Sequence, residues 1–407
     1  MAQTAAGFLS PYKVLDLTDQ RGLLAGRMLG QLGADVVQVE PPGGSPARRV
    51  GPFTDDPAPD NSLYWSAYAS AKRGVTCDLD SAEGRERLLK LAARADFLIE
   101  SETPGAMRRR GLAWEHLQGV NPALVHVSIT AFGSDGPKAG WADSEIVLWA
   151  AGGALYPARD GEGPPLRITA PQAWLHAAAD AAGAALIAHF ARLQSGRGQH
   201  VDISAQISVA ECTLSTVLAW PIGDPRGAPP PPGSPPPLRP PRSSWDSLDG
   251  RVEMALGVGA VGGGSTNALF AWMREEGESD PRFDDWDWML VLARFQAGEL
   301  TQDELDAARA VIARFFARRT TAELVAQALE RRILLTQIQT AKTLIESEHF
   351  NGRGLFATVD EATGPRTLPH AFARVAGGFA PLRPAPRIGE HNAEVFREWL
   401  GLEEAVA

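Results

Sequence analysis

Short apolar runs alternate with longer amphipathic segments along the first half of the chain. The apolar runs predict strands at 14–17, 34–39, 96–100 and 124–130. The segments between them predict helices at 22–32, 82–94 and 114–118. Strands and helices that alternate in this way are typical of a parallel sheet covered by helices. We therefore expect an α/β fold with right-handed crossovers, arranged in Rossmann-like layers.

An alanine-rich segment follows at 173–194, and it is apolar around most of its circumference. This pattern predicts a long buried helix. Gly196 and Gly198 indicate where the helix ends, because glycine readily adopts the left-handed conformation found at helix C-termini. A further strand is expected at 200–203.

Residues 221–242 are dense in proline. Proline lacks an amide hydrogen and fixes one backbone angle, so such a run is incompatible with a helix or a central strand. We expect a stiff extended connector; a polyproline ligand for another domain is the alternative. The connector implies a large domain at 1–220, a smaller and largely helical domain at 243–335, and a return to the large domain at 336–407.

The composition narrows the class of protein. Hydrophobic residues make up 44% and charged residues 22%, as in globular proteins. The net charge of −10 argues against general binding to nucleic acids or anionic membranes. With only Cys77 and Cys212, neither a disulfide framework nor a cysteine metal site is expected. The first residues do not resemble a secretory signal and no apolar run is long enough to span a membrane, so we expect a cytoplasmic protein.

Four groups of short motifs occur in order along nearly the whole chain. They are VLDLT and LGADVVQVEPPGG within 14–44; KR, DL, ADFLIE, PGAM and GL within 72–112; NP, FG, GP and SGRGQHVD within 121–202; and APRIGEHN at 385–392. Together they resemble the family III CoA-transferases, the group of formyl-CoA transferase and α-methylacyl-CoA racemase. The resemblance implies a Rossmann-like large domain formed by both chain ends, a smaller inserted domain, and two chains interlocked as a dimer.

The same resemblance implies a binding site for coenzyme A (CoA). The phosphates of CoA require cations or N–H donors. The matching positions are Arg48 or Arg49, Lys72 and Arg109, with Lys138 beside a glycine-rich turn as a further candidate. The alternative for each is an ordinary surface charge. CoA or an acyl-CoA enters as a substrate together with a carboxylic acid, and no covalently bound cofactor or metal is expected.

One position departs from the family pattern. The resemblance implies an aspartate nucleophile that attacks the acyl-CoA, forms an acyl anhydride, and then becomes an aspartyl-CoA thioester. Counting back without gaps from the motif at Ser195 places Trp174 at that position. An indole forms neither intermediate.

Other side chains are candidates for the missing role. Asp180 lies in an Asp-x-x-Gly sequence similar to that of the family, but aligning it there requires a deletion within the helix. His176 and Asp180 are i,i+4 neighbours, which fits an acid/base pair or a structural hydrogen bond. Glu145 matches a family glutamate near the nucleophile, and it either acts as a base or holds water. Gln20 matches a glutamine near the thioester, or it only begins a helix.

Three functions are consistent with these observations. The first is an enzyme that moves CoA between carboxylic acids, or acts otherwise on an acyl-CoA, through a relocated acid or different chemistry. The second is a non-catalytic subunit in a heterodimer with a paralogue that carries the aspartate. The third is a CoA-binding regulatory protein. Fold alone does not choose between them, because function resides in the site.

Overall fold

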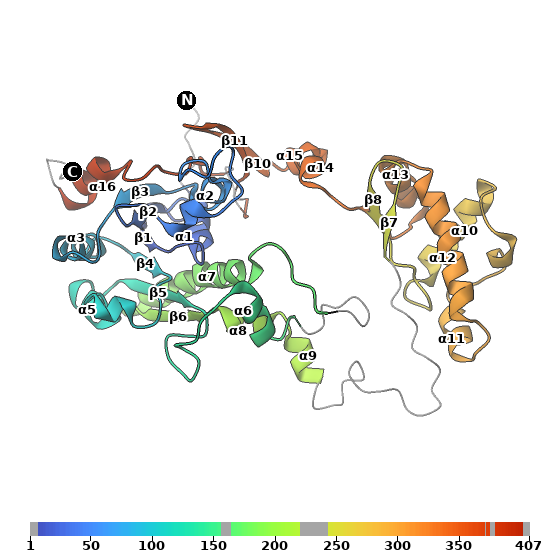
Figure 1. Cartoon of the computed structure of the whole chain (residues 1–407), viewed down its shortest axis with the longest axis horizontal. Helices are drawn as coiled ribbons and strands as arrows, with labels where there is room; N and C mark the ends of the chain where they lie inside the picture. The colour runs from blue at the N-terminus through green and yellow to red at the C-terminus, as the bar shows by residue number, and fades with distance from the viewer. Residues whose placement is uncertain (1–6, 156–163, 220–242, 371, 375–378, 402–407) are drawn as a thin grey trace. The chain divides into compact units, whose positions relative to one another are not determined.

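The computed structural model describes residues 7–155, 164–219, 243–370, 372–374 and 379–401. The chain divides into two compact units (Figure 1). Each unit has its own hydrophobic core. The first unit consists of Met1–Trp220 with Glu348–Ala407, and the second of Pro221–Ser347. The predicted connector at 221–242 lies outside the described residues.

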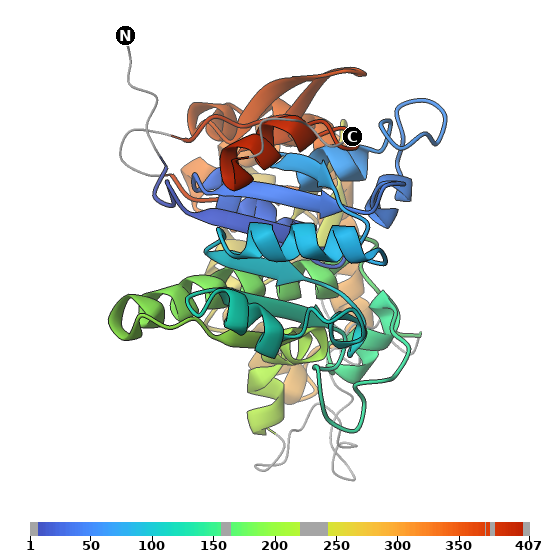
Figure 2. The ribbon, with the colours of Figure 1, turned by 90° about the vertical axis from the view of Figure 1, so that its left-hand side faces the viewer.

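A six-stranded sheet forms the centre of the first unit, in the order β3-β2-β1-β4-β5-β6 (Figure 2). Its strands are β1 Lys13–Leu17, β2 Asp35–Glu40, β3 Arg73–Thr76, β4 Phe97–Glu100, β5 Val125–Thr130 and β6 His200–Ser204. All neighbouring strands are parallel. The strand order reverses between β1 and β4, as in a doubly wound Rossmann-like sheet. The expected α/β fold is confirmed.

Helices cover both faces of this sheet. The first face carries α1 Leu23–Gln31 and α7 Gln172–Ser195; the second carries α3 Ala82–Ala92, α5 Trp114–Val120 and α16 Asn392–Leu400. On β1, Val14 packs in the core of the first face and Leu15 in the core of the second. Because both faces are buried, β2, β4 and β5 are buried at nearly every position, whereas the edge strand β6 alternates between more and less exposed residues.

Helix α7 is the long alanine-rich helix expected at 173–194. Its buried face consists mainly of alanines, whose small side chains let the helix lie close to α1 and to the sheet. The helix ends at Gly196, which has a φ of 70° and donates its N–H to the carbonyl of Arg192. Glycine adopts this conformation without steric cost.

The C-terminal segment completes the first unit, so both chain ends build it. The N–H of His391 donates to the carbonyl of Gly74, and the N–H of Thr76 donates to the side chain of Asn392 at 2.8 Å. These bonds attach the start of α16 to β3. The other elements of this unit are η1 Pro46–Arg49, α2 Leu63–Ala69, α4 Ala106–Arg109, α6 Glu145–Ala151, α8 Ala205–Glu211, α9 Leu214–Ala219, α15 Glu348–Gly352, β10 Phe356–Glu361 and β11 Gly364–Pro369.

The second unit is largely helical and has an aromatic core. Its elements are β7 Ser244–Asp246, β8 Arg251–Glu253, α10 Gly263–Glu275, η3 Pro281–Phe283, α11 Val291–Gln296, α12 Gln302–Ala317, α13 Thr321–Arg331, β9 Thr336–Gln337 and α14 Ala341–Glu346. The three strands form an antiparallel sheet. Trp245, Trp272 and Trp288 are fully buried among phenylalanines and leucines.

Candidate active site

Two loops meet at the carboxyl edge of the large sheet, where the strand order reverses. The loop after β1 contains Asp19, and the loop after β4 contains Ser101. The N–H of Asp19 donates to Ser101 Oγ at 3.0 Å, and the Ser101 hydroxyl donates to Asp19 Oδ1 at 3.0 Å. Ligands of doubly wound folds bind at this edge. These hydrogen bonds therefore hold the two loops together at one side of a candidate site.

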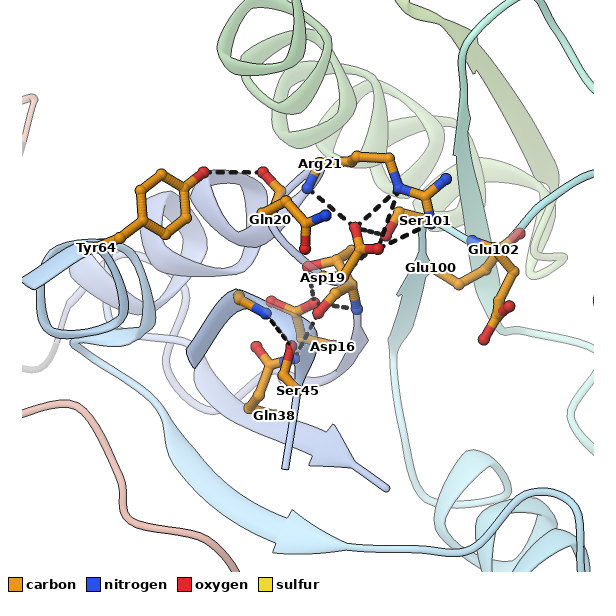
Figure 3. A network of polar contacts seen from close by, with 12 residues as sticks. Asp16, Asp19, Gln20, Arg21, Gln38, Ser45, Tyr64, Glu100, Ser101 and Glu102 are labelled. Carbon is orange, nitrogen blue, oxygen red and sulfur yellow. Dashed lines mark hydrogen bonds and ion pairs between the residues drawn. The ribbon is translucent and has the colours of Figure 1, made fainter. Parts of the chain in front are cut away.

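Asp19 also holds the side chain of Arg21 in place beside these loops (Figure 3). Its Nε donates to Asp19 Oδ1 at 2.9 Å and its Nη2 donates to Oδ2 at 2.9 Å. The guanidinium carbon lies 5.9 Å from the centroid of the Trp174 ring. Burial opposes the charge of Arg21, but the hydrogen bonds and the charge of Asp19 outweigh burial and raise its pKa. Arg21 is therefore a fixed cation in contact with an aromatic face.

Gln20 lies next to Arg21 and is fixed through its backbone. The hydroxyl of Tyr64 donates to the carbonyl of Gln20 at 2.9 Å. Burial raises the pKa of Tyr64, so the phenol stays a neutral donor. The side-chain oxygen of Gln20 is buried and accepts no hydrogen bond from the residues that the structure describes.

Glu145 joins the starts of two helices. Its Oε1 accepts the N–H of Ala173, at the start of α7, at 2.7 Å. The same oxygen accepts Trp149 Nε1–H, from α6, at 2.8 Å. Its other oxygen is buried and has no partner within the described part of the chain. The structure thus brings one uncommitted carboxylate oxygen to the beginning of α7, beside Trp174.

The residues predicted on α7 lie at different places. Trp174 is only 6% exposed, and its ring lies beside the guanidinium of Arg21. Asp180 is exposed, about 9 Å further along the helix axis at 1.5 Å per residue. Among the described residues no hydrogen bond joins His176 to Asp180. Of these three residues, Trp174 lies in the candidate site.

Lys72 is fully buried in a network of its own. Its ammonium donates to Asp16 Oδ2 at 2.7 Å, to the carbonyl of Leu23 at 2.9 Å and to Gln38 Oε1 at 2.9 Å. Burial lowers the pKa of Lys72, and the neighbouring Asp16 opposes this effect. All three N–H donors of the ammonium are used, so Lys72 ties β1, β2 and α1 together in this structure.

Arg48 is also buried and satisfied by protein atoms. It donates to both oxygens of Glu40 at 2.7 Å, to Asp60 at 3.1 Å and to the carbonyl of Pro386 at 2.8 Å. Its guanidinium carbon lies 3.9 Å from the centroid of the Trp65 ring. Arg48 therefore fastens the segment after β2 to the C-terminal segment.

The other predicted cations are accessible. Arg49 is exposed, and Lys138 is half-buried with its ammonium 5.2 Å from the centroid of the Trp141 ring. Arg109 is exposed and lies on α4, which follows the carboxyl end of β4. It lines a pocket of about 500 Å³ together with Asp80, Arg85, Ala106, Arg110 and Gly111. The guanidinium of Arg109 is therefore accessible in this pocket.

Sequence analysis missed Asp16, Asp19, Arg21 and Ser101. Only Asp16 gave a signal that pointed to it, because a carboxylate in an otherwise apolar strand must be paired when it is buried. Asp19 and Ser101 are 82 residues apart in the chain, so no local pattern indicates that they meet.

In the described ranges, no group of histidine, cysteine and acidic side chains has an arrangement that holds a metal ion. No described helix combines the length and apolarity that crossing a bilayer requires.

Comparison with known proteins identifies the family. The chain matches CoA-transferase family III over residues 9–392. It is 31% identical over 397 residues to subunit BbsE of succinyl-CoA:(R)-benzylsuccinate CoA-transferase from Thauera aromatica, covering 96% of this chain and 93% of the relative. It is 30% identical over 394 residues to succinyl-CoA–D-citramalate CoA-transferase from Chloroflexus aurantiacus, covering 94% and 91%.

A solved structure agrees with this assignment. The crystal structure of a CaiB/BaiF family protein from Brucella suis matches with a TM-score of 0.81 and 25% identity, covering 97% of this chain and 100% of that one. The present chain therefore belongs to CoA-transferase family III, a class of enzymes that passes CoA from one carboxylic acid to another. The family resemblance of the sequence motifs is confirmed.

Proposed function

We propose that this chain binds an acyl-CoA at the carboxyl edge of its six-stranded sheet and exchanges the CoA between two carboxylic acids. One observation carries the proposal: the loop after β1, which contains Gln20 and Arg21, meets the start of α7, where Arg21 lies against Trp174. Glu145 binds the N–H of Ala173 at the same helix start, and its other oxygen is buried without a partner among the described residues. Arg109 provides an accessible cation on the same edge of the sheet. This arrangement supports a thioester in the centre and the CoA phosphates at the periphery.

In this proposal the cations have two different tasks. Arg109 binds phosphate directly, and Arg49 and Lys138 are further accessible candidates for the same task. Arg48 and Lys72 are occupied by internal partners, so they act by holding the strands and loops of the site in place.

The covalent step requires a carboxylate, and we assign it to Glu145. Its carboxylate attacks the thioester carbonyl, CoA leaves as a thiolate, and an acyl–glutamyl anhydride forms. The thiolate then attacks the glutamyl carbonyl, releases the first acid, and leaves a glutamyl-CoA thioester. The second acid attacks this thioester, which gives a new acyl–glutamyl anhydride and the thiolate. The thiolate finally attacks the new acyl carbonyl, so that the second acyl-CoA forms and the Glu145 carboxylate is released. Asp180 stands further along α7 and is exposed, so it is the less favoured carboxylate.

Trp174 supports a second possibility. It is buried as a well-packed core side chain, and it stands where the family nucleophile is expected. A relative of this chain is named as a subunit of its enzyme. The chain in that case contributes a binding site to a heterodimer whose catalytic aspartate belongs to a paralogue. A regulatory protein that only binds CoA is the third possibility.

The proposal extends to the location and assembly of the protein. We propose a cytoplasmic, interlocked dimer, formed either by two copies or with a paralogue.

The names of two relatives suggest the kind of acyl group. The two relatives are named for succinyl-CoA with benzylsuccinate or citramalate, all of which carry a second carboxylate. We extend the proposal to an acyl group of this dicarboxylic kind.

Mass spectrometry of the purified chain tests the covalent step. We expect succinyl-CoA to leave an adduct on the peptide that contains Glu145, and hydroxylamine to remove it, because hydroxylamine cleaves activated acyl groups. Glu145→Gln keeps an oxygen that accepts hydrogen bonds but removes the nucleophile, so the adduct should disappear. An adduct on Asp180 contradicts the assignment to Glu145. A chain that binds acyl-CoA but forms an adduct only on a co-purified paralogue supports the two-chain enzyme.

A further inference from the structure

Arg21 has one hydrogen-bonding edge committed and one available. Nε and Nη2 form the edge that binds Asp19. Figure 3 shows the remaining nitrogen, Nη1, pointing away from Asp19. No described residue accepts a hydrogen bond from Nη1. A guanidinium is rigid and planar, so an Asp that fixes one edge also fixes the direction of the other.

A second arginine of the same unit indicates what such an edge binds. Arg73 uses Nε and Nη2 for Asp35, at 3.0 and 2.5 Å. Its Nη1 binds the carboxylates of Glu394 and Glu398 at 2.8 and 2.7 Å. One guanidinium therefore serves several carboxylates when they approach from different edges. Arg21 likewise binds one aspartate through Nε and Nη2, but no described residue binds its Nη1.

The surroundings of Arg21 favour a ligand over a solvated charge. Its side chain is 20% exposed and lies against the indole of Trp174. Partial burial strengthens a charge-assisted hydrogen bond relative to the same bond in water. The nearby Glu102 is engaged by Arg110 at 2.9 Å, and Asp143 is exposed to solvent. Neither acid occupies the free edge of Arg21.

We propose that Arg21, fixed by Asp19 and Trp174, binds the second carboxylate of the acyl group through Nη1 and so selects dicarboxylic substrates. This inference rests on the proposed function, because it assumes that the thioester lies at the carboxyl edge of the sheet. In this inference Arg21 recognises the free carboxylate of the acyl group and does not bind the CoA portion.

Calorimetric titration of the full chain with succinyl-CoA, butyryl-CoA and CoA tests the assignment. Succinyl and butyryl groups have the same chain length and differ by a terminal carboxylate. We expect the wild-type chain to bind succinyl-CoA at least about 10-fold more tightly than butyryl-CoA. Arg21→Gln should bring the two affinities within about 2-fold of each other and leave CoA binding unchanged. Arg21→Lys should retain only part of the preference, since an ammonium lacks the planar fork.

Arg282 supplies the matched control. It binds Asp280 two residues earlier in the same way, with Nε to Oδ1 at 3.1 Å and Nη2 to Oδ2 at 2.7 Å, but its side chain is 68% exposed. Arg282→Gln should leave the preference for succinyl-CoA intact.

The possible results distinguish failure of the Arg21 role from failure of the proposed function. Equal wild-type affinity for the two thioesters overturns the role of Arg21 alone. So does an Arg21→Gln chain, folded by circular dichroism, that loses affinity equally for all three ligands, because that result identifies a structural role. Failure of the wild-type chain to bind any of the three ligands overturns the proposed function and this inference with it.

Discussion

Glu100 and His126 form a buried titratable pair on the neighbouring strands β4 and β5. Glu100 Oε1 lies 3.8 Å from His126 Nε2. Burial raises the pKa of Glu100 to about 7. Burial, together with the nearby His200, lowers the pKa of His126 to about 3. In mildly acidic solution both groups are neutral in the folded chain, whereas the unfolded chain carries an ionised Glu and a protonated His.

The two pKa shifts change stability with pH in opposite directions. The raised pKa of Glu100 gives stabilisation that is complete below pH 4.5 and is lost as the pH rises to about 7. The lowered pKa of His126 gives stabilisation that is complete above pH 6.5 and is lost as the pH falls to about 3. Between pH 4.5 and 6.5 the two effects offset each other.

Urea unfolding across this window measures the balance. We expect the contribution of this pair to the wild-type free energy of unfolding to stay nearly constant. Glu100→Gln removes the acid, so the free energy should rise with pH relative to wild type, by at most about 1.4 kcal/mol per pH unit. His126→Phe should give the opposite relative slope. If the free energy of unfolding of both variants changes with pH as it does in the wild type, the assigned pKa values are contradicted.

At the scale of elements, Glu145 acts on the start of α7. The residue before this helix, Pro171, provides no side-chain cap. Glu145 reaches across from α6 and accepts the N–H of Ala173. A backbone donor at a helix start that loses its acceptor remains unsatisfied when it is buried. Glu145 therefore has a structural task in addition to its proposed chemical one.

Two substitutions distinguish these tasks. Glu145→Ala should lower the free energy of unfolding by about 1–2 kcal/mol, the usual effect of losing a helix cap. Glu145→Gln should lower it less, because the amide oxygen still accepts hydrogen bonds. Chemical denaturation measures both values, with Glu86→Ala as the control. Glu86 pairs with Lys90 on the surface, so this change should stay within about 0.5 kcal/mol. An equal loss in both Glu145 variants contradicts the capping role.

The sequence predicts five of the six strands of the large sheet and helix α7, but it misses β3 and the side-chain networks of the site. Buried parallel strands and the alanine-rich helix have local patterns, so their positions follow from periodicity and length. Counting along one continuous helix also identified Trp174 in the candidate site. For Lys72 and Arg48, in contrast, the family resemblance predicts phosphate binding. Their partners Asp16 and Glu40 come from separate strands, and contacts of this kind have no local signature.

At the scale of the whole molecule, α7 presents an apolar surface. Ile187, Phe190 and Leu193 are 73%, 65% and 65% exposed. Apolar side chains gathered on one helix in this way are typical of an interface. This surface supports the proposed dimer, in which a second chain covers α7.

Light scattering after gel filtration tests the proposed assembly. An interlocked homodimer has a mass of 87 kDa, twice the 43.5 kDa of one chain. We expect a dimer for the chain alone or with a paralogue, and Phe190→Glu should reduce it because a charge at the interface must be desolvated. Leu329→Glu, at a side chain 75% exposed on α13 of the second unit, is the control. A monomer under both conditions contradicts the proposed assembly.

The contribution of both chain ends to one unit has a consequence for biosynthesis. Strands β1 to β4 leave the ribosome hundreds of residues before α16, whose Val395, Phe396 and Trp399 pack in the core of the second face. During translation the nascent chain therefore exposes an apolar surface that its own missing helix will later cover. Such surfaces promote aggregation and recruit chaperones. Slow elongation through the second unit prolongs this vulnerable interval, and the core of the second face is complete only when α16 has been synthesised.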